Sequence, residues 1–308
     1  MIILPRMRDV LKRVIPLWFV LCSSFTIAEV EDAGPSAIKV LIVDGFSNHH
    51  WKQTTQIIKT QLEASGRFFV EVSTTPSTKE SLGWDEWRPV FSNYDVVIQN
   101  CNSHGGRPLW PQDVQRDLEK YVRGGGGLYI LHSANNAFPE WKEYNSMIGL
   151  GWRKKDFGVA ITIDKSGKVM RVPAGEGRGT SHGKRIDAVL TRIGDHPIHQ
   201  DMPRRWMAAD LEVYSYARGP AENLTVLSYA REPHTQLNFP IEWVVRYGKG
   251  RVYNSTLGHV WKDALNPPAI RCVGFQTLLL RVTEWLATEK VTFPIPADFP
   301  SEDKVKLR

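Results

Sequence analysis

The strongest constraint on the fold is an alternation of apolar, β-branched runs with amphipathic segments in the first half of the chain. Residues 37–45 (AIKVLIVDG) form a continuous apolar run that ends in Asp-Gly, which is typical of a strand buried on both faces. The elements expected in this half are strands over residues 37–45, 68–75, 94–100 and 127–132, and helices over residues 51–66 and 111–125. Short connections in a β-α-β-β-α-β order predict an α/β fold with a doubly wound, mostly parallel, flavodoxin-like sheet.

Past residue 150 the alternation ends, and the pattern predicts a loop-rich and hairpin insertion. A hairpin is expected around residues 165–167, followed by a loop-rich segment that extends to about residue 220. Strands over residues 224–230, 241–248 and 250–259 and a helix over residues 270–288 are expected to complete the sheet and cover it. These signals predict one domain over residues 38–289 and a Pro-rich, charged tail over residues 290–308.

The first 28 residues have the pattern of a secretory signal peptide. Four basic residues between positions 6 and 13 form a leader, residues 14–28 form an apolar core, and Ala28 is a small residue suited to cleavage. The apolar run is short and interrupted by polar residues, so a stable membrane insertion after cleavage is not expected. We therefore expect export to the periplasm or the medium, with an uncleaved membrane anchor as the alternative.

Charge and cysteine content exclude several classes of protein. Removal of residues 1–28 takes away four basic residues and one acidic residue, which lowers the formal charge from +6 to +3. The remaining basic residues are scattered, so no nucleic-acid partner is expected. Beyond the leader only Cys101 and Cys272 remain, which implies no disulfide framework and leaves open whether the two are bridged.

Polar side chains follow four of the expected strands at the point where each strand ends. Asp44 ends the first strand and leads to His49, Asn102 follows the third, His132 ends the fourth, and His259 follows the last. In an open parallel sheet, ligands bind outside the carboxyl ends of the strands. We therefore expect these side chains to converge on one site, with His132 and His259 suited to proton transfer near neutral pH.

Two other interpretations of the histidines stay open. A lone histidine in a loop is more often a surface or capping residue than a catalytic one. Neutral imidazole and carboxylate groups also suit zinc and similar ions, so a divalent metal is a candidate cofactor. Its candidate ligands are His49, His132 and His259, together with a carboxylate from Asp44, Glu212 or Glu242. The chain contains no HExxH, CxxC or GxSxG motif, and the glycines at 124–127 precede a strand, unlike those of a nucleotide-binding loop.

Several segments together resemble one family. The segments are KVLIVDG with His49, YDVVI, LEKYVRGGGGLYILHSANNAF, SHG with His182, DHPIHQDMPRRW with EVY from Glu212, and PIEWVVRYGKGRVYNSTLGH. In their order and spacing they are similar to the ThuA-like, trehalose-utilisation family, whose fold resembles that of class I glutamine amidotransferases. In the amidotransferases the residue at the tight turn after a central strand, called the elbow, is a nucleophilic cysteine partnered by histidine and glutamate. Here His132 stands at the elbow and neither cysteine does, so we expect that the protein is not a glutaminase.

Together with the signal-peptide pattern, the resemblance leads us to expect an exported carbohydrate-active enzyme. The resemblance implies action on a glycoside or a keto-sugar, as a hydrolase or lyase, and we expect histidine acid/base chemistry with or without a metal. The expected catalytic residues are His132, His259, His182 and Glu212, and the expected substrate-binding residues are Asp44, His49, Trp51, Asn102, Ser133 and Trp141. The alternatives are a non-catalytic sugar- or glycan-binding protein on the same fold and a metal-dependent hydrolase of another small substrate. The expected partner is a small carbohydrate, and a homo-oligomer is compatible with the sequence.

Overall fold

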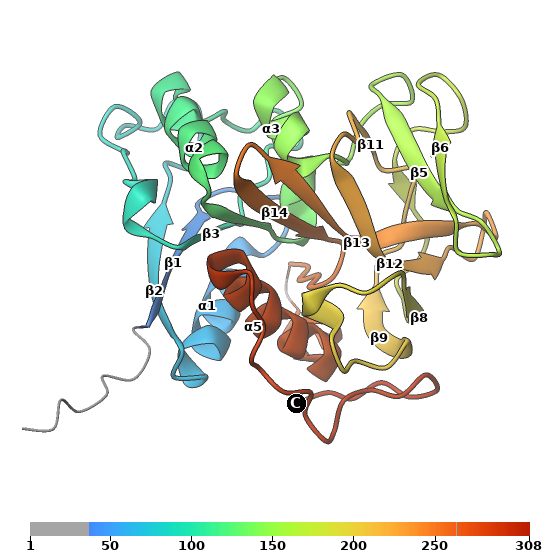
Figure 1. Cartoon of the computed structure of the whole chain (residues 1–308). Coiled ribbons are helices and arrows are strands. Elements are labelled where there is room, and N and C mark those ends of the chain that lie inside the picture. Colours follow the sequence, from blue (N-terminus) through green and yellow to red (C-terminus); the bar gives the residue numbers. More distant parts are fainter. Residues whose placement is uncertain (1–36, 263) are drawn as a thin grey trace, which may run out of the picture. The chain divides into compact units, whose positions relative to one another are not determined.

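The computed structural model describes residues 37–262 and 264–308, and a sheet of twelve strands runs through them (Figure 1). Its main path follows the order β2 (Phe68–Thr74), β1 (Ile38–Asp44), β3 (Val96–Gln99), β4 (Gly127–Ile130), β14 (Gly250–Ser255), β13 (Asn238–Tyr247), β12 (Leu224–Arg231), β8 (Ile186–Arg192) and β9 (Arg205–Leu211). The first five strands of this path are parallel, and the remaining pairs are antiparallel. The predicted α/β fold with a mostly parallel sheet is confirmed for this core.

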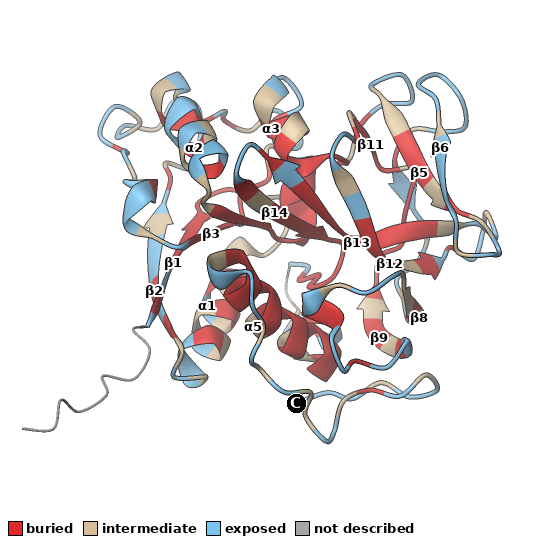
Figure 2. Ribbon diagram, viewed as in Figure 1, coloured by how far each residue is buried: buried red, intermediate tan, exposed pale blue. Residues whose placement is uncertain are grey.

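Helices cover both faces of the parallel strands (Figure 1). The helices α1 (Trp51–Ala64) and α5 (Val273–Thr288) lie on one face, and α2 (Gln112–Gly124) and α3 (Lys142–Ile148) lie on the other. Successive residues of β1 enter two separate hydrophobic clusters, because side chains alternate across a strand. Figure 2 shows the buried strands between the helices, of which α1 and α2 expose their outer faces while α5 is largely buried. This double burial explains why β1 is a continuous apolar run in the sequence.

The second half of the chain contains more strand than its sequence pattern predicts. The expected hairpin is present as β5 (Val159–Ile163) and β6 (Val169–Val172), with Gly167 in the left-handed region at φ 87°. The segment expected to be rich in loops up to about residue 220 also contains β8 and β9, so that expectation is wrong for these two strands. The reason is that β8 buries few positions, so its apolar pattern is weak. The C-terminal tail runs along β9, where Met207 N donates to Ser301 O at 2.8 Å.

A buried carboxylate ties the antiparallel strands together next to β14. Glu242 on β13 accepts hydrogen bonds from Ser228 Oγ at 2.6 Å and from Tyr253 OH at 2.7 Å, and it lies 3.3 Å from His199 Nε2. Burial acts to raise the pKa of Glu242, but His199 and these hydrogen bonds outweigh it and hold the pKa below its usual value. Because all its contacts are internal, Glu242 serves the fold.

The structure also shows the state of the two cysteines and whether any described helix could span a membrane. Cys101 and Cys272 are both free and buried, and burial raises the pKa of the Cys101 thiol far above its usual value. Within residues 37–262 and 264–308, no helix has the length and apolar character needed to cross a membrane. The predicted signal peptide, residues 1–28, lies outside the residues that the structure describes.

Candidate active site

His132 stands at a strained elbow directly after β4. The strand ends at Ile130, and a short 3-10 turn, η2 (His132–Asn136), begins with His132 in the left-handed region at φ 42°. This conformation is uncommon for a residue with a side chain, and such strain clusters at functional sites. The His132 ring is buried, and its Nδ1 lies 2.8 Å from the carbonyl oxygen of Thr256, just beyond the neighbouring strand β14. The elbow therefore directs the imidazole toward the carboxyl end of the neighbouring strand β14.

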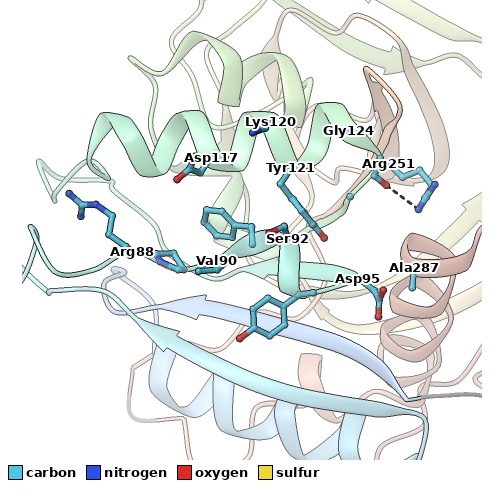
Figure 3. A pocket seen from close by; sticks show the side chains of 15 residues that line it. Arg88, Val90, Ser92, Asp95, Asp117, Lys120, Tyr121, Gly124, Arg251 and Ala287 are labelled. Carbon is cyan, nitrogen blue, oxygen red and sulfur yellow. Dashed lines mark hydrogen bonds between the residues drawn. The ribbon is translucent and has the colours of Figure 1, made fainter.

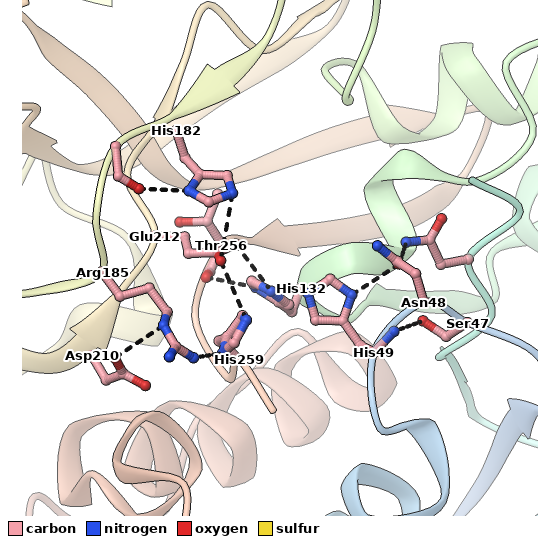
Figure 4. A network of polar contacts seen from close by, with 12 residues as sticks. Ser47, Asn48, His49, His132, His182, Arg185, Asp210, Glu212, Thr256 and His259 are labelled. Atoms are coloured by element: carbon pink, nitrogen blue, oxygen red, sulfur yellow. Dashed lines mark hydrogen bonds and ion pairs between the residues drawn. The ribbon is translucent and has the colours of Figure 1, made fainter. Parts of the chain in front are cut away.

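Four of the predicted site residues come together at this edge (Figure 4). The rings of His49, His132 and His259 form a triangle with centroids 5.0 to 5.1 Å apart. Glu212, from the turn between β9 and β10 (Tyr214–Ser215), places its carboxylate oxygens 3.6 Å from His132 Nε2 and 3.3 Å from His259 Nε2. We call these four residues the histidine cluster. Its members come from four parts of the chain that meet only in the folded protein.

Hydrogen bonds at the outer nitrogens determine which nitrogen of His49 and of His132 faces the cluster. His132 Nδ1 faces a carbonyl oxygen and must therefore carry its proton. His49 Nδ1 lies 3.0 Å from Asn48 Oδ1, which also accepts from Asn102 Nδ2 at 2.6 Å, so this Nδ1 is protonated too. In both neutral rings Nε2 is a bare acceptor. Both Nε2 atoms are buried and have no hydrogen-bond partner among the described residues.

His259 is held in the opposite tautomer. Arg185 Nη1 lies 2.7 Å from His259 Nδ1, and a guanidinium has only donors, so this Nδ1 accepts the hydrogen bond. The neutral His259 ring therefore carries its proton on Nε2, on the side of Glu212. Arg185 is itself held by Asp210, whose Oδ1 lies 3.4 Å from Nε. Two histidines thus offer lone pairs to the cluster, and the third offers a proton.

His182 lies at the open side of the cluster. Its side chain is 36% exposed, its Nδ1 lies 2.7 Å from Gly183 O, and its Nε2 lies 3.7 Å from Glu212 Oε1. Trp152 packs edge-on against the His182 ring with centroids 5.6 Å apart. His182 is therefore the histidine best placed to exchange protons between Glu212 and solvent or a bound molecule.

The other predicted site residues are placed at varying distances from the cluster. Asn102 supports it through Asn48, as described above, and Ser133 is buried beside His132. Asp44 instead accepts hydrogen bonds from Thr55 and Thr74 and ties β1 to its neighbours; burial raises its pKa. The other two predicted site residues, both tryptophans, also have structural roles: Trp51 starts α1, and its carbonyl accepts from Asn100, while Trp141 is buried in the core, where its indole donates to Glu119.

Three residues of the site were missed in the sequence. Asn48 and Trp261 each lie within two positions of a predicted histidine, and this proximity to a strand end was a usable signal. Trp261 is 44% exposed and packs against His49 and His259, with ring centroids 5.1 and 6.1 Å away. Arg185 lies between β7 (Ser181–His182) and β8, where no pattern distinguishes it from a surface arginine.

A separate cleft of about 630 Å³ lies at the opposite ends of the parallel strands, next to α2 (Figure 3). Asp95 and Gly126 line it, and these residues directly precede β3 and β4. The cleft therefore lies at the amino ends of the parallel strands, whereas His132 lies at their carboxyl ends. It is separate from the histidine cluster.

The histidine cluster has the composition of a metal site. One donor atom from each of His49, His132, His259 and Glu212 lies within 4.8 Å of the other three. Ligands around a tetrahedral zinc ion lie about 3.4 Å apart, as bond lengths of about 2.0–2.1 Å require. The contacts of Glu212 already match this spacing, and the bare Nε2 atoms of His49 and His132 are the natural ligands. His259 faces the cluster with a protonated Nε2. It could serve as a fourth ligand only if it lost the contact with Arg185 and carried its proton on Nδ1 instead.

Fold and site together define an α/β protein with a buried histidine and carboxylate site at the carboxyl edge of its parallel strands. Residues 39–285 match the family model described as ThuA, trehalose utilisation. The chain belongs to the ThuA family. This family assignment confirms the resemblance inferred from the sequence.

A ThuA-like protein from Parabacteroides merdae ATCC 43184 has a solved structure with 34% identity and a TM-score of 0.81, over 88% of this chain and 98% of that one. Weaker likenesses include the β-galactosidase from Rahnella sp. R3, with 15% identity and a TM-score of 0.40 over 71% of this chain and 28% of that one. A cytoplasmic protein from Salmonella typhimurium LT2 shows 12% identity and a TM-score of 0.43 over 82% and 100% of the two chains. None of the curated proteins matches the chain.

The histidine cluster should make the stability of the metal-free protein depend on pH. Burial, followed by the neighbouring imidazoles, lowers the pKa of His49 and of His259 in the folded state. In the unfolded chain both return to about 6.5, so below that pH the unfolded state binds more protons than the folded state. The stabilising contribution is therefore complete above about pH 6.5 and is lost as the pH falls below it.

We expect the His49→Gln variant to show a shallower fall of unfolding free energy than the parent between about pH 8 and about pH 5. Urea unfolding in the presence of a chelator measures this difference. Identical pH dependence in the two proteins would contradict the assignment of a lowered pKa to His49.

Proposed function

We propose that the protein is a carbohydrate-active enzyme of the ThuA family whose histidine cluster binds a divalent metal and acts on a glycoside or a keto-sugar. The observation that carries this proposal is that the buried Nε2 atoms of His49 and His132 have no hydrogen-bond partner among the described residues, although both rings lie in one cluster with the Glu212 carboxylate. Leaving a buried polar atom without a partner costs on the order of 1–3 kcal/mol. A bound cation would satisfy both atoms at once.

His49, His132 and Glu212 would hold the metal, which leaves coordination positions open, as catalytic sites require. Two imidazoles and one carboxylate suit zinc and similar transition-metal ions better than magnesium or calcium. When bound, such an ion supplies Lewis-acid polarisation of a substrate oxygen. The hydrogen bonds at Nδ1 of both histidines would orient the rings and increase their basicity as ligands.

The remaining polar groups supply proton transfer. His259 has its proton on the nitrogen that faces the cluster, because Arg185 occupies the other nitrogen. It can therefore donate to an oxygen that develops negative charge beside it. His182, partly exposed and 3.7 Å from Glu212, can then return a proton from solvent to His259 by way of the Glu212 carboxylate, which lies 3.3 Å from His259 Nε2. A positioned acid or base of this kind contributes roughly 10²- to 10⁴-fold to a rate.

The carbohydrate part of the proposal rests on the family and on the aromatic side chains at the opening. Trp152 lies against His182, and Trp261 lies against His49 and His259. An indole offers a flat apolar face next to a polar group, which suits the C–H face of a sugar ring. Assays with disaccharides and 3-keto glycosides, with and without added metal, would test the class. Sugar binding without turnover would point instead to a sugar-binding protein on this fold.

Export is the second part of the proposal, supported by the basic leader, the apolar core and Ala28 in the sequence. We expect the natively produced protein to be exported and to begin close to Glu29. N-terminal sequencing of the protein from its source cells is the measurement. An intact Met1 in a cytoplasmic fraction would contradict it.

Loss of the His132 imidazole should remove both the metal and the activity. We expect His132→Ala to lower turnover by at least about 10²-fold and to lower the bound metal per chain, because a ligand is lost. Atomic emission analysis of the purified protein and a glycoside assay measure the two effects. The His132 ring is buried, so its truncation should also lower stability somewhat, and circular dichroism must show that the variant is folded under the assay conditions.

The matched control is His50→Asn, a change at the neighbour of His49. His50 caps α1 by accepting from Gln53 N at 3.2 Å, and asparagine keeps a capping oxygen. It should retain both metal and turnover. A folded His132→Ala protein with full metal content and full activity would refute the proposed site.

A further inference from the structure

A second opening lies next to the histidine cluster and has no role in the chemistry described so far. Its volume is about 850 Å³, which falls in the range of roughly 300–1,000 Å³ typical of small-molecule sites. Its lining includes His104, Glu140, Trp152, Lys154, Phe157 and Thr180. We call it the side cleft.

The side cleft shares a wall with the cluster. The Trp152 indole lines the cleft and also packs against His182 and Tyr214, with centroids 5.6 and 5.2 Å away. Thr180 lines the cleft immediately before β7, which carries His182. The side cleft and the histidine cluster therefore adjoin each other through the Trp152 side chain and the short segment from Thr180 to His182.

A second aromatic side chain lines the cleft. Phe157 is 40% exposed, and the guanidinium carbon of Arg153 lies 5.4 Å from the centre of its ring. Arg153 is itself immobilised, because its guanidinium donates to the backbone carbonyls of Asn135, Asn136, Ala137 and Trp152 and to the Asn145 side chain. A large apolar ring held in position within a polar cleft is a stacking surface for a ligand ring.

The polar groups of the cleft carry both signs of charge. Lys154 and Lys155 lie with Glu140 and Asp156, and in the part of the chain that the structure describes none of the four forms an ion pair. Arg153 also lines the cleft, but its guanidinium already donates to backbone carbonyls and to Asn145. The two lysines and the two carboxylates balance each other, so the cleft favours neither an anionic nor a cationic ligand. An uncharged ligand with many hydroxyl groups can use the lysines as donors and the carboxylates as acceptors.

We propose that the side cleft is the subsite for the leaving group of the substrate, and that it takes an uncharged pyranose ring. The ring's C–H face would lie against an aromatic side chain and its hydroxyl groups would reach the charged side chains. The assignment as a leaving-group subsite rests on the proposed reaction at the cluster. Binding of the ring in the cleft does not, which allows the two to be tested separately.

The experiment compares ligands with and without the second ring by isothermal titration calorimetry on the full chain. The probes are trehalose, maltose and cellobiose, each measured against the methyl glucoside of the same anomeric configuration. We expect at least one disaccharide to bind about tenfold more tightly than its methyl glucoside. Phe157→Ala should weaken that disaccharide by about 2- to 10-fold, as the loss of one aromatic contact predicts, and leave the methyl glucoside unchanged.

The matched control is Phe69→Ala on the edge strand β2, where the side chain is 52% exposed and away from the cleft. This variant should bind every probe as the parent does. If no disaccharide exceeds its methyl glucoside, or if Phe157→Ala weakens both probes equally, the subsite is refuted.

Turnover of the same sugars, and of their 3-keto forms, separates the two proposals. Selective disaccharide binding without turnover would leave the subsite in place and remove the proposed reaction. Turnover with the same KM for disaccharide and methyl glucoside would leave the reaction in place and remove the subsite.

Discussion

The hydrogen bond between His132 Nδ1 and the carbonyl oxygen of Thr256 is the contact on which the rest of the site depends. It joins the ends of β4 and β14, which are parallel neighbours in the sheet with Ile130 opposite Asn254. The same bond places the proton of His132 on Nδ1 and orients the ring so that the unprotonated Nε2 points toward the cluster. The left-handed backbone at His132 is tolerated because the elbow is buried and held on several sides.

Electrostatics disfavours protonation of the imidazoles in the cluster. Burial disfavours a charged imidazole, so the pKa of His132 is lowered although Glu212 acts in the other direction. The cluster therefore holds neutral rings around one carboxylate. Arg185 adds a positive charge at its outer side, and Asp210 lies 3.4 Å from that guanidinium. A metal ion that binds to neutral nitrogens and a carboxylate needs no proton to be expelled from His49 or His132, which lowers the cost of binding.

The sequence was most informative where one physical rule dominated. Continuous apolar runs such as that of β1 predicted the parallel strands, because burial on both faces requires them, and strand ends predicted His49, His132 and His259. Glu212 was one of three candidate carboxylates for a metal, and His182 was found only through the family resemblance, since nothing in their local pattern places them beside the elbow. Asp44 also ends a strand, but it turns toward Thr55 and Thr74, because register and side-chain direction are decided by tertiary packing. Arg185 left no trace in the sequence for the same reason.

The most direct test is a crystal structure of the protein grown with zinc and measured at the zinc absorption edge. The account predicts one anomalous peak in the cluster, about 2.0–2.2 Å from His49 Nε2, His132 Nε2 and a carboxylate oxygen of Glu212. The contact between Arg185 and His259 Nδ1 should persist beside it. A cluster without a peak, or a zinc ion bound elsewhere while His49 and His132 keep bare Nε2 atoms, would contradict the account.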